Sequence, residues 1–424
     1  MESFQIDDLK INLDIEGARE FSKVSYPLRY GHFNEISTPK YIFQFNLSGE
    51  IKFIAGRGKS WPDPSEWLKR TVTNDWIYYS TGGYSGVYDS FGEYYLPCLP
   101  YPSNSINSSD PFSNNAVSSA IDSLQELHEK ITALYTDSLP NSLKSFFNLV
   151  TGQSPQNLEL RSRRLHKIIG DSVTVLPPDS RHVDYEVIPV IVADGCLYKC
   201  GFCRVKSRLD FLNRSKEDIK SQIKGLKEFY GSDITNYNAI FLAQHDALHA
   251  GEELLEFAAD YAYEAFEFER SNLKGASLYL FGSVDSILNS NYTLFDRLEE
   301  LPFSTYINIG LESADEETLA TLKKAITPEA VDEAFARILE INRMYEKVEI
   351  TANFLFGDNL PKGHLPSFFQ LIEKNIDRPL SKGAIYFSPI INGAVKERRG
   401  IKREFYKLKV RSRLPAFLYL IQRL

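Results

Sequence analysis

The feature that most limits how this chain can fold is a regular alternation of apolar runs and amphipathic segments after residue 186. Each run is continuously apolar, as expected for a strand buried on both faces of a parallel sheet. Between the runs, apolar residues recur every three or four positions, which indicates helices. The six predicted strands cover residues 186–193, 238–243, 276–282, 305–310, 348–357 and 384–390. The pattern predicts an α/β domain over residues 186–390, with helices outside a parallel sheet.

Two architectures satisfy these six repeats: an open doubly wound sheet and a partial barrel. A dinucleotide-binding sheet would carry a Gly-x-Gly-x-x-Gly turn after its first strand, and a phosphate-binding loop would carry a Walker sequence. We find no such turn after the first predicted strand and no Walker sequence. This argues against an ordinary nucleotide-binding fold at that position.

Residues 1–175 lack this regular alternation, and their sequence pattern predicts an α+β accessory domain. Its first part, residues 1–110, is rich in turns and in β-forming residues, and residues 40–56 have the pattern of a β-hairpin. Helical spacing of apolar residues then predicts a helical part, residues 115–165. The chain thus divides into an accessory domain, a parallel α/β domain and a short C-terminal segment.

The composition, with 43% hydrophobic and 25% charged residues, is that of an ordinary globular protein with ample material for a core. We find no secretory signal at the start and no apolar run of about 18 residues, the length that indicates a membrane span. Four unevenly spaced cysteines do not form a disulfide framework and fit a reducing compartment. We therefore expect a cytoplasmic protein.

The net charge of −8 is unevenly distributed along the chain. Residues 391–424 carry ten basic and two acidic side chains, whereas residues 186–390 have an acidic excess. A basic segment of this kind is either a solvated or docked part of the molecule, or a surface for an anionic partner. The sequence leaves both interpretations open.

Three of the four cysteines, Cys196, Cys200 and Cys203, lie in one loop directly after the first predicted parallel strand. In α/β folds chemistry takes place at the carboxyl ends of the strands, so this loop has the position of a catalytic site. Soft thiolates select zinc, copper(I) or an iron–sulfur cluster. Structural zinc requires four protein ligands, so Cys98 or a distant histidine would have to complete a zinc site. A [4Fe–4S] cluster held by three cysteines instead leaves one iron open for a small-molecule ligand.

The spacing Cys196-x-x-x-Cys200-x-x-Cys203, with the aromatic Phe202 before the last cysteine, resembles the cluster loop of the radical S-adenosylmethionine (radical SAM) superfamily. The resemblance implies a partial (β/α)6 TIM-type barrel with this loop after its first strand, in agreement with the six repeats. It also implies a [4Fe–4S] cluster on the three cysteines, with S-adenosylmethionine chelating the open iron through its amino and carboxylate groups. Phe202 is then expected beside the adenine.

The end of the fourth predicted strand extends this resemblance. Gly310-Leu311-Glu312-Ser313 closes the strand, and Lys324 lies twelve residues after Glu312. The arrangement is similar to the elongator-like branch of the superfamily. The resemblance implies that Glu312 binds the ribose hydroxyls and that Lys324 binds the methionine carboxylate. The chemistry agrees, because a carboxylate accepts hydroxyl hydrogen bonds and an ammonium pairs with a carboxylate.

Other strand ends supply further polar residues that the resemblance places near the cofactor. Where the superfamily usually has a Gly-Gly-Glu-like turn for the methionine ammonium, this sequence has Ala243-Gln244-His245-Asp246. The expected cofactor-binding residues outside the loop are Gln244, Asp246, Ser283, Glu312, Lys324 and Asn353.

Several subfamilies of the branch do not fit the sequence. The position two residues after the third cysteine is Val205, not the further cysteine of coproporphyrinogen oxidases. Cys98 alone cannot supply the second cluster of methylthiotransferases, and no cysteine follows Cys203. Residues 1–150 also lack the alternation of a Rossmann-like cobalamin domain. We therefore expect one cluster and an accessory domain of another type.

The resemblance implies reductive cleavage of S-adenosylmethionine to methionine and a 5′-deoxyadenosyl radical, which abstracts hydrogen from a substrate that the sequence does not identify. Such an enzyme requires an external one-electron donor of the flavodoxin or ferredoxin type. The competing hypothesis is a zinc- or cluster-binding interaction protein without catalytic activity, for instance a nucleic-acid binder that uses the basic residues 391–424.

Overall fold

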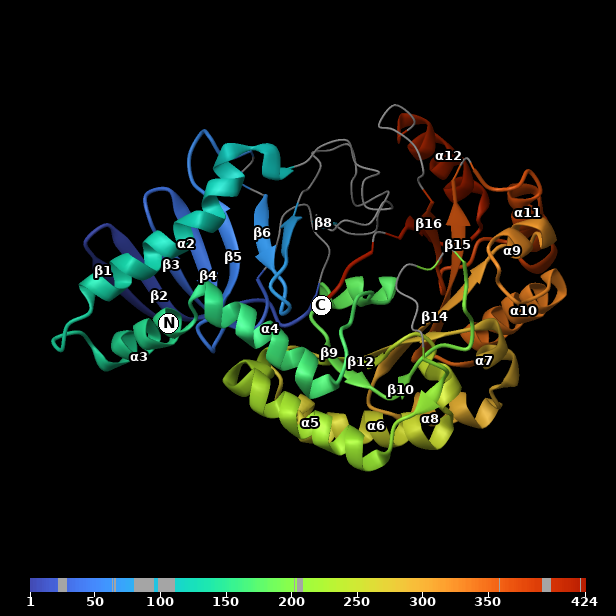
Figure 1. Cartoon of the computed structure of the whole chain (residues 1–424), viewed down its shortest axis with the longest axis horizontal. Coiled ribbons are helices and arrows are strands. Elements are labelled where there is room, and N and C mark those ends of the chain that lie inside the picture. The colour runs from blue at the N-terminus through green and yellow to red at the C-terminus, as the bar shows by residue number, and fades with distance from the viewer. Residues whose placement is uncertain are drawn as a thin grey trace.

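Figure 1 shows the computed structural model of the chain, which has two large sheets side by side. The structure describes residues 1–21, 29–62, 64, 66–79, 95–97, 111–201, 203, 209–357, 359–390, 398–419 and 421–424. Across these residues, no helix combines the length and the apolar character that crossing a membrane requires.

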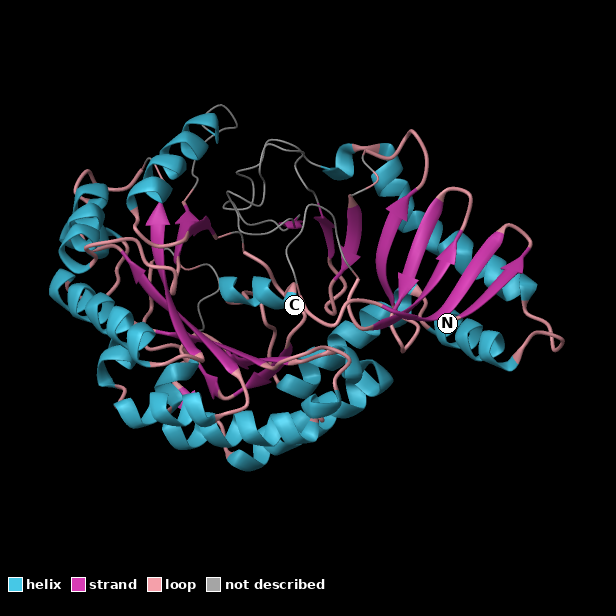
Figure 2. Ribbon diagram, turned by 180° about the vertical axis from the view of Figure 1, so that it is seen from behind, coloured by secondary structure: helices cyan, strands magenta, loops and turns pink. Residues whose placement is uncertain are grey.

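The N-terminal sheet is an antiparallel meander of eight strands in sequence order, β1 to β8. Helices cover one of its faces (Figures 1 and 2). The strands are β1 Glu2–Ile6, β2 Leu9–Glu16, β3 His32–Ser37, β4 Tyr41–Phe45, β5 Ile51–Gly56, β6 Trp67–Arg70, β7 Trp76–Tyr79 and β8 Tyr95–Pro97. The short helix η3 spans Pro111–Ser113, and the long helices are α2 Asn115–Leu134, α3 Asn141–Gly152 and α4 Pro155–Ile169.

The predicted hairpin at residues 40–56 is confirmed, because β4 pairs with β5 in antiparallel register. The helical part is confirmed as well, although it consists of three helices. Asn114 caps α2 with its side chain, and Pro140 precedes α3. Buried apolar side chains join sheet and helices, as in the edge-to-face contact of Phe45 with Phe146 at 5.7 Å.

The second sheet contains seven parallel strands in the order β17-β16-β15-β14-β13-β12-β9. Their bounds are β9 Ile188–Ile191, β12 Ala239–Ala243, β13 Ser277–Gly282, β14 Ser304–Glu312, β15 Val348–Phe356, β16 Ile385–Pro389 and β17 Ala416–Leu418. The six predicted strands are therefore confirmed. The expected number of six is too small, because β17 pairs in parallel with β16 and adds a seventh strand from the basic segment.

Helices cover the outer, convex face of the parallel sheet (Figure 2). The α-helices are α5 Lys216–Tyr230, α6 Glu252–Ala265, α7 Val284–Asn289, α8 Tyr292–Glu300, α9 Glu316–Thr321, α10 Pro328–Met344, α11 His364–Asn375 and α12 Arg398–Arg411. Short 3-10 helices are η4 Pro178–Val183, η5 Gly231–Asn236, η6 Ala247–Ala250 and η7 Phe268–Arg270. Ser215 and Thr327 cap the starts of α5 and α10, since each side chain accepts a hydrogen bond from a backbone N–H of the first turn.

The linker between the two sheets places η4 against the concave face of the parallel sheet. Asp179 accepts hydrogen bonds from Thr351 at 2.6 Å and from Tyr386 at 2.8 Å. His182 stacks on Tyr306 with ring centroids 5.0 Å apart. The interior near the amino ends of the strands is thus filled by the chain itself.

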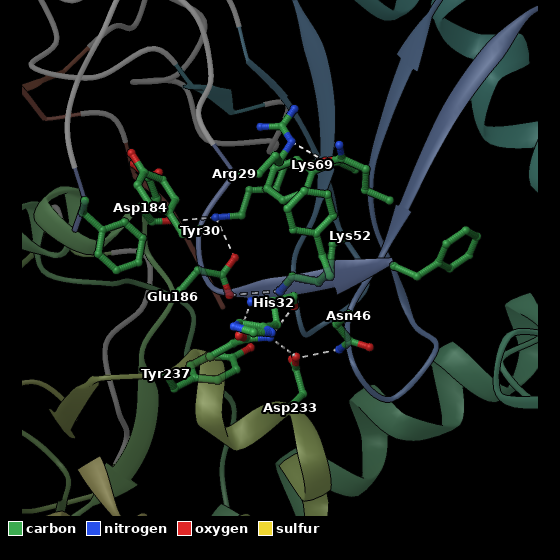
Figure 3. A pocket seen from close by; sticks show the side chains of 16 residues that line it. Arg29, Tyr30, His32, Asn46, Lys52, Lys69, Asp184, Glu186, Asp233 and Tyr237 are labelled. Carbon is green, nitrogen blue, oxygen red and sulfur yellow. Dashed lines mark hydrogen bonds and ion pairs between the residues drawn. The ribbon is translucent and has the colours of Figure 1, made fainter. Parts of the chain in front are cut away.

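A buried ion cluster joins the two sheets (Figure 3). Both oxygens of Glu186 are engaged, one by Lys69 at 2.7 Å and the other by Lys52 at 2.9 Å. We call these three residues the interface cluster. It lines a cavity of about 70 Å³ together with Asp233, which accepts a hydrogen bond from Asn46 at 2.9 Å. Because Glu186 lies two residues before β9, this cavity is at the amino ends of the parallel strands, away from the cysteine loop.

Candidate functional site

The cysteine loop connects the two strands of a small hairpin that follows β9. Strand β10 (Ala193–Asp194) pairs with β11 (Leu212–Asn213), and Arg214 binds both oxygens of Asp194 at 2.7 and 2.8 Å. Gly195 opens the loop with φ +80°, and a Cβ there would lie 2.2 Å from the carbonyl oxygen of Asp210. Only glycine tolerates both this backbone conformation and this close approach, so the start of the loop requires glycine at position 195.

The three cysteines lie together on this loop, with Cys200 buried and the other two half-buried. The pKa of the Cys200 thiol is raised to about 11, chiefly by burial and also by Glu312, Cys203 and Cys196, whereas nearby Lys324 opposes the rise. Burial also raises the pKa of Cys196. In the part of the chain that the structure describes, no three His, Cys, Asp or Glu side chains are already arranged as a metal site. The three thiols therefore share a region but not yet a coordination geometry.

The loop contacts the end of β14 and the helix after it. The backbone N–H of Gly201 donates to the carbonyl oxygen of Leu322 at 2.8 Å. The ammonium of Lys324 lies 5.5 Å from the ring centre of Tyr198, and the Tyr198 hydroxyl accepts a hydrogen bond from the backbone of Asp285 at 3.2 Å. The cysteine loop, the β14 end and the start of α7 thus form one contiguous site.

Glu312 and Lys324 form a buried pair at the carboxyl end of β14. The Lys324 ammonium lies 3.3 Å from the Glu312 carboxylate and donates to the carbonyl oxygen of Gly310 at 2.5 Å. Glu312 has φ +65°, a left-handed conformation that non-glycine residues rarely adopt. A Cβ on Gly310 would lie 2.7 Å from the carboxylate of Glu312, so glycine is required there for the side chain to reach Lys324. We call Glu312 and Lys324 the strand-end pair.

Asp246 is a buried carboxylate with one engaged and one unengaged oxygen. Its Oδ1 accepts from the backbone N–H of Ser283 at 3.0 Å. Its Oδ2 has no hydrogen-bond partner among the described residues. Burial raises the pKa of Asp246, and its charge in turn raises the pKa of Cys196. An unpaired buried acceptor is costly, which makes this oxygen a candidate for a cationic ligand group.

The remaining candidates are engaged within the chain. Ser283 caps α7 and accepts from the backbone of Ser286. The Gln244 amide donates to the Ser172 carbonyl at 3.1 Å, and the Asn353 amide donates to Asn308 at 2.5 Å. Phe202 and Cys98 lie outside the described residues.

Two residues of this region escaped the sequence reasoning. Tyr198 sits between the first two cysteines, and a polar aromatic residue at that place was a usable signal. His364 lies far along the chain, yet its ring contacts Ser313, which directly follows Glu312. No spacing rule connects positions 51 residues apart, so this contact could only come from the fold.

Comparison with known proteins bears on these residues. Residues 190–362 match the family model described as the radical SAM superfamily. This stretch contains the cysteine loop, the strand-end pair and Asp246. No curated protein matches the chain.

Solved structures that resemble the chain include the cobalamin-dependent S-adenosylmethionine radical enzyme OxsB with aqua-cobalamin and S-adenosylmethionine bound, at 15% identity and a TM-score of 0.33. That match covers 55% of this chain and 31% of the other, so the chain spans about a third of that protein's length. Methylornithine synthase (PylB) matches at 12% identity and a TM-score of 0.32, over 69% of this chain and 85% of the other. Scores this low do not establish a shared overall fold. The family match shows that residues 190–362, about two fifths of the chain, are similar to the radical SAM superfamily domain, a type whose enzymes use a [4Fe–4S] cluster and S-adenosylmethionine.

Proposed function

We propose that this chain is a radical SAM enzyme in which Cys196, Cys200 and Cys203 hold a single [4Fe–4S] cluster. The observation that carries the proposal is the juxtaposition of the cysteine loop with the strand-end pair, through the contact of Gly201 with Leu322. When bound and reduced, such a cluster supplies one electron that cleaves S-adenosylmethionine to methionine and a 5′-deoxyadenosyl radical, and the radical abstracts hydrogen from the substrate.

The donor set fits the cluster. Three thiols, with no histidine within ten residues of them in the sequence, suit a cluster with one open iron, and soft thiolates are its usual ligands. Burial disfavours the thiolate form of Cys200, so without a metal this buried side chain stays a thiol. Lys324 opposes that effect and stabilises negative charge on the loop.

The strand-end pair has the chemistry to bind S-adenosylmethionine. In our proposal, Lys324 binds the methionine carboxylate and Glu312 accepts hydrogen bonds from the two ribose hydroxyls. The two side chains contact each other in the structure, so the ligand has to separate them. Lys324 and Glu312 would each replace their present contact with a charge-assisted hydrogen bond to the ligand. This limits the free energy needed to separate them.

Asp246 is the residue we propose for the methionine ammonium. The unengaged Oδ2 of this buried carboxylate supports the assignment, because an ammonium would supply the missing donor. Ser283 holds the other oxygen and thereby orients the carboxylate. Gln244 and Asn353 remain proposed contacts whose amides would have to exchange their present partners, and Phe202 remains the proposed adenine neighbour.

The architecture we propose is the partial TIM-type barrel of the superfamily's elongator-like branch, extended by β17 and preceded by the accessory domain. We also propose an external one-electron donor of the flavodoxin or ferredoxin type and a cytoplasmic location. An anionic partner for residues 391–424 stays a weaker proposal. In α12, Lys407 already pairs with Glu404, and Arg411 pairs with Glu373 and stacks on Phe369 at 3.4 Å.

The test is anaerobic reconstitution of the full chain with iron and sulfide, followed by dithionite and S-adenosylmethionine. We expect a brown protein with absorbance near about 400 nm, about four irons per chain, and 5′-deoxyadenosine detected by mass spectrometry. A Cys98→Ala variant serves as the matched control and should keep its iron. A colourless protein with one zinc per chain would refute the proposal and favour an interaction protein.

A further inference from the structure

His364 is a buried histidine whose two ring nitrogens are both engaged close to the strand-end pair. It is the first residue of α11 and only 2% exposed. Its Nε2 lies 2.8 Å from the carbonyl oxygen of Leu355, on β15. Its Nδ1 lies 2.8 Å from the hydroxyl of Ser313, directly after β14. The ring thus bridges the ends of two neighbouring strands.

These partners define the tautomer of the ring. A carbonyl oxygen only accepts, so Nε2 carries the hydrogen and donates to Leu355. In the neutral ring Nδ1 then accepts, and the Ser313 hydroxyl donates to it. Burial lowers the pKa of His364, which agrees with a neutral ring. Ser313 is therefore held by a directional hydrogen bond from outside its own segment.

Ser313 stands between the two members of the strand-end pair. On one side it follows Glu312, which has the strained φ of +65°. On the other side its Oγ accepts from the backbone N–H of Asp315 at 3.1 Å. Asp315 caps α9 by accepting from Thr318 at 2.9 Å, and the backbone N–H of Lys324 is tied to the end of that helix. One serine thus links the conformation of Glu312 to the helix that presents Lys324.

The start of α11 is pressed against the same turn. A Cβ on Gly363 would lie 2.2 Å from the carboxylate of Asp315. The turn at residues 312–315 is therefore braced by α11 through His364 and through this close approach. Strained residues keep their conformation only where the surroundings over-determine it.

We propose that His364 is a positioning residue for the S-adenosylmethionine site, acting through Ser313 on Glu312 and Lys324. The inference rests on the proposed function, because Glu312 and Lys324 are assigned to the cofactor there. It adds a residue on α11 that touches neither the cysteine loop nor the assigned cofactor groups in the contacts described above.

Two conservative substitutions separate positioning from mere packing. In His364→Asn, the side-chain oxygen stands where Nδ1 stood and still accepts from Ser313. In His364→Gln, the amide reaches toward Leu355 and leaves Ser313 without its acceptor. If the contact with Ser313 matters, His364→Gln weakens S-adenosylmethionine binding about tenfold, which corresponds to about 1.4 kcal/mol, and His364→Asn stays within about threefold of wild type.

The measurements are made on the full chain. The dissociation constant of S-adenosylmethionine is taken from the change it causes in the electron paramagnetic resonance spectrum of the reduced cluster, with iron content measured in parallel. Hydrogen exchange of residues 311–324 is followed without cofactor and should become faster in His364→Gln and in Ser313→Ala. The Ser313→Ala variant removes only a hydroxyl and is informative if a histidine variant fails to fold.

His128→Ala is the matched control, because His128 is another buried histidine (7% exposed) but lies in α2 of the N-terminal region. It should leave both readouts unchanged. Equal binding by His364→Asn and His364→Gln, or unchanged exchange in residues 311–324, would overturn the inference. If wild type binds neither cluster nor S-adenosylmethionine, the proposed function fails, and the exchange data still decide whether His364 braces the turn.

Discussion

The interface cluster and the strand-end pair are both largely buried ionic contacts, yet they differ in how fully the acidic groups around them are engaged. In the interface cluster, the two oxygens of Glu186 are each held by one lysine in ordinary geometry. In the strand-end pair, one lysine faces one carboxylate, the carboxylate carries a strained backbone, and an unengaged oxygen of Asp246 lies in the same site. One arrangement is complete, whereas the other leaves capacity for a ligand.

This difference indicates how buried charged residues that stabilise the fold can be distinguished from those that bind a ligand. Burial and pairing occur at both places and so do not distinguish them. Left-handed backbone also occurs at both places, at Glu312 and at Asp184 and Tyr185 just before Glu186. What distinguishes the two places is the unengaged carboxylate oxygen of buried Asp246 at the carboxyl ends of the strands, where α/β folds place chemistry. The interface cluster lies at the opposite ends, where such residues usually serve stability.

Glu186→Gln should have the largest effect on folding. It leaves buried Lys69 and partly buried Lys52 facing a neutral amide, so we expect a loss of about 3 kcal/mol in the free energy of unfolding. Urea unfolding of the full chain measures it. S-adenosylmethionine binding by the protein that remains folded should match wild type. Weakened S-adenosylmethionine binding without a loss of stability would contradict the assignment of the interface cluster to folding.

Glu312→Gln should show the opposite pattern. The amide cannot accept two hydroxyl hydrogen bonds with the strength of a carboxylate, so affinity for S-adenosylmethionine should fall about 30-fold, or about 2 kcal/mol. Stability should fall less than in Glu186→Gln, because only one lysine loses its partner and Gly310 still accepts from it. Titration calorimetry and urea unfolding on the same preparations give both numbers. An unchanged affinity would remove Glu312 from the proposed site.

Gly310→Ala tests the same pair without changing a charge. The new methyl group would stand 2.7 Å from the Glu312 carboxylate, so the side chain has to move. We expect an approximately tenfold weaker affinity for S-adenosylmethionine, with iron content unchanged. Gly152→Ala is a suitable control, because nothing lies within 4 Å of a Cβ at that exposed position. Wild-type affinity in Gly310→Ala would show that the observed pair geometry is dispensable.

The smallest expected effect is on the pH dependence of the free energy of unfolding. Burial alone would raise the pKa of Glu186, but Lys52 and Lys69 outweigh it and lower the pKa from its ordinary 4.5 to about 2. Between these values the unfolded chain binds the proton and the folded chain does not, so the contribution of Glu186 is lost as the pH falls. The slope of stability against pH should be smaller in Glu186→Gln, by at most about 1.4 kcal/mol per pH unit between pH 4.5 and 2. Parallel slopes would contradict this assignment.

The sequence predicted the parallel strands well because their apolar runs are long and uninterrupted. It missed β17 because Ala416–Leu418 has only three residues in a strongly basic neighbourhood, and what makes it a strand is the exposed edge of β16. Local pattern does not carry that information, since it depends on which edge the fold leaves open.

The candidate site likewise has features that are local in the sequence and features that depend on the fold. The cysteine spacing and the motif around Glu312 are local and can be read directly from the sequence. The engagement of Asn353 by Asn308 and the brace from His364 depend on contacts between strands and helices far apart in the chain. Local sequence pattern therefore suggests the candidate residues, but not which of them already bind other parts of the chain.

The short helix η4 has a consequence for the direction from which a molecule can approach Glu312. Asp179 binds Thr351 and Tyr386, and His182 stacks on Tyr306, so the chain itself occupies the concave side near the amino ends of these strands. A molecule that approaches Glu312 from that side would therefore have to displace these contacts.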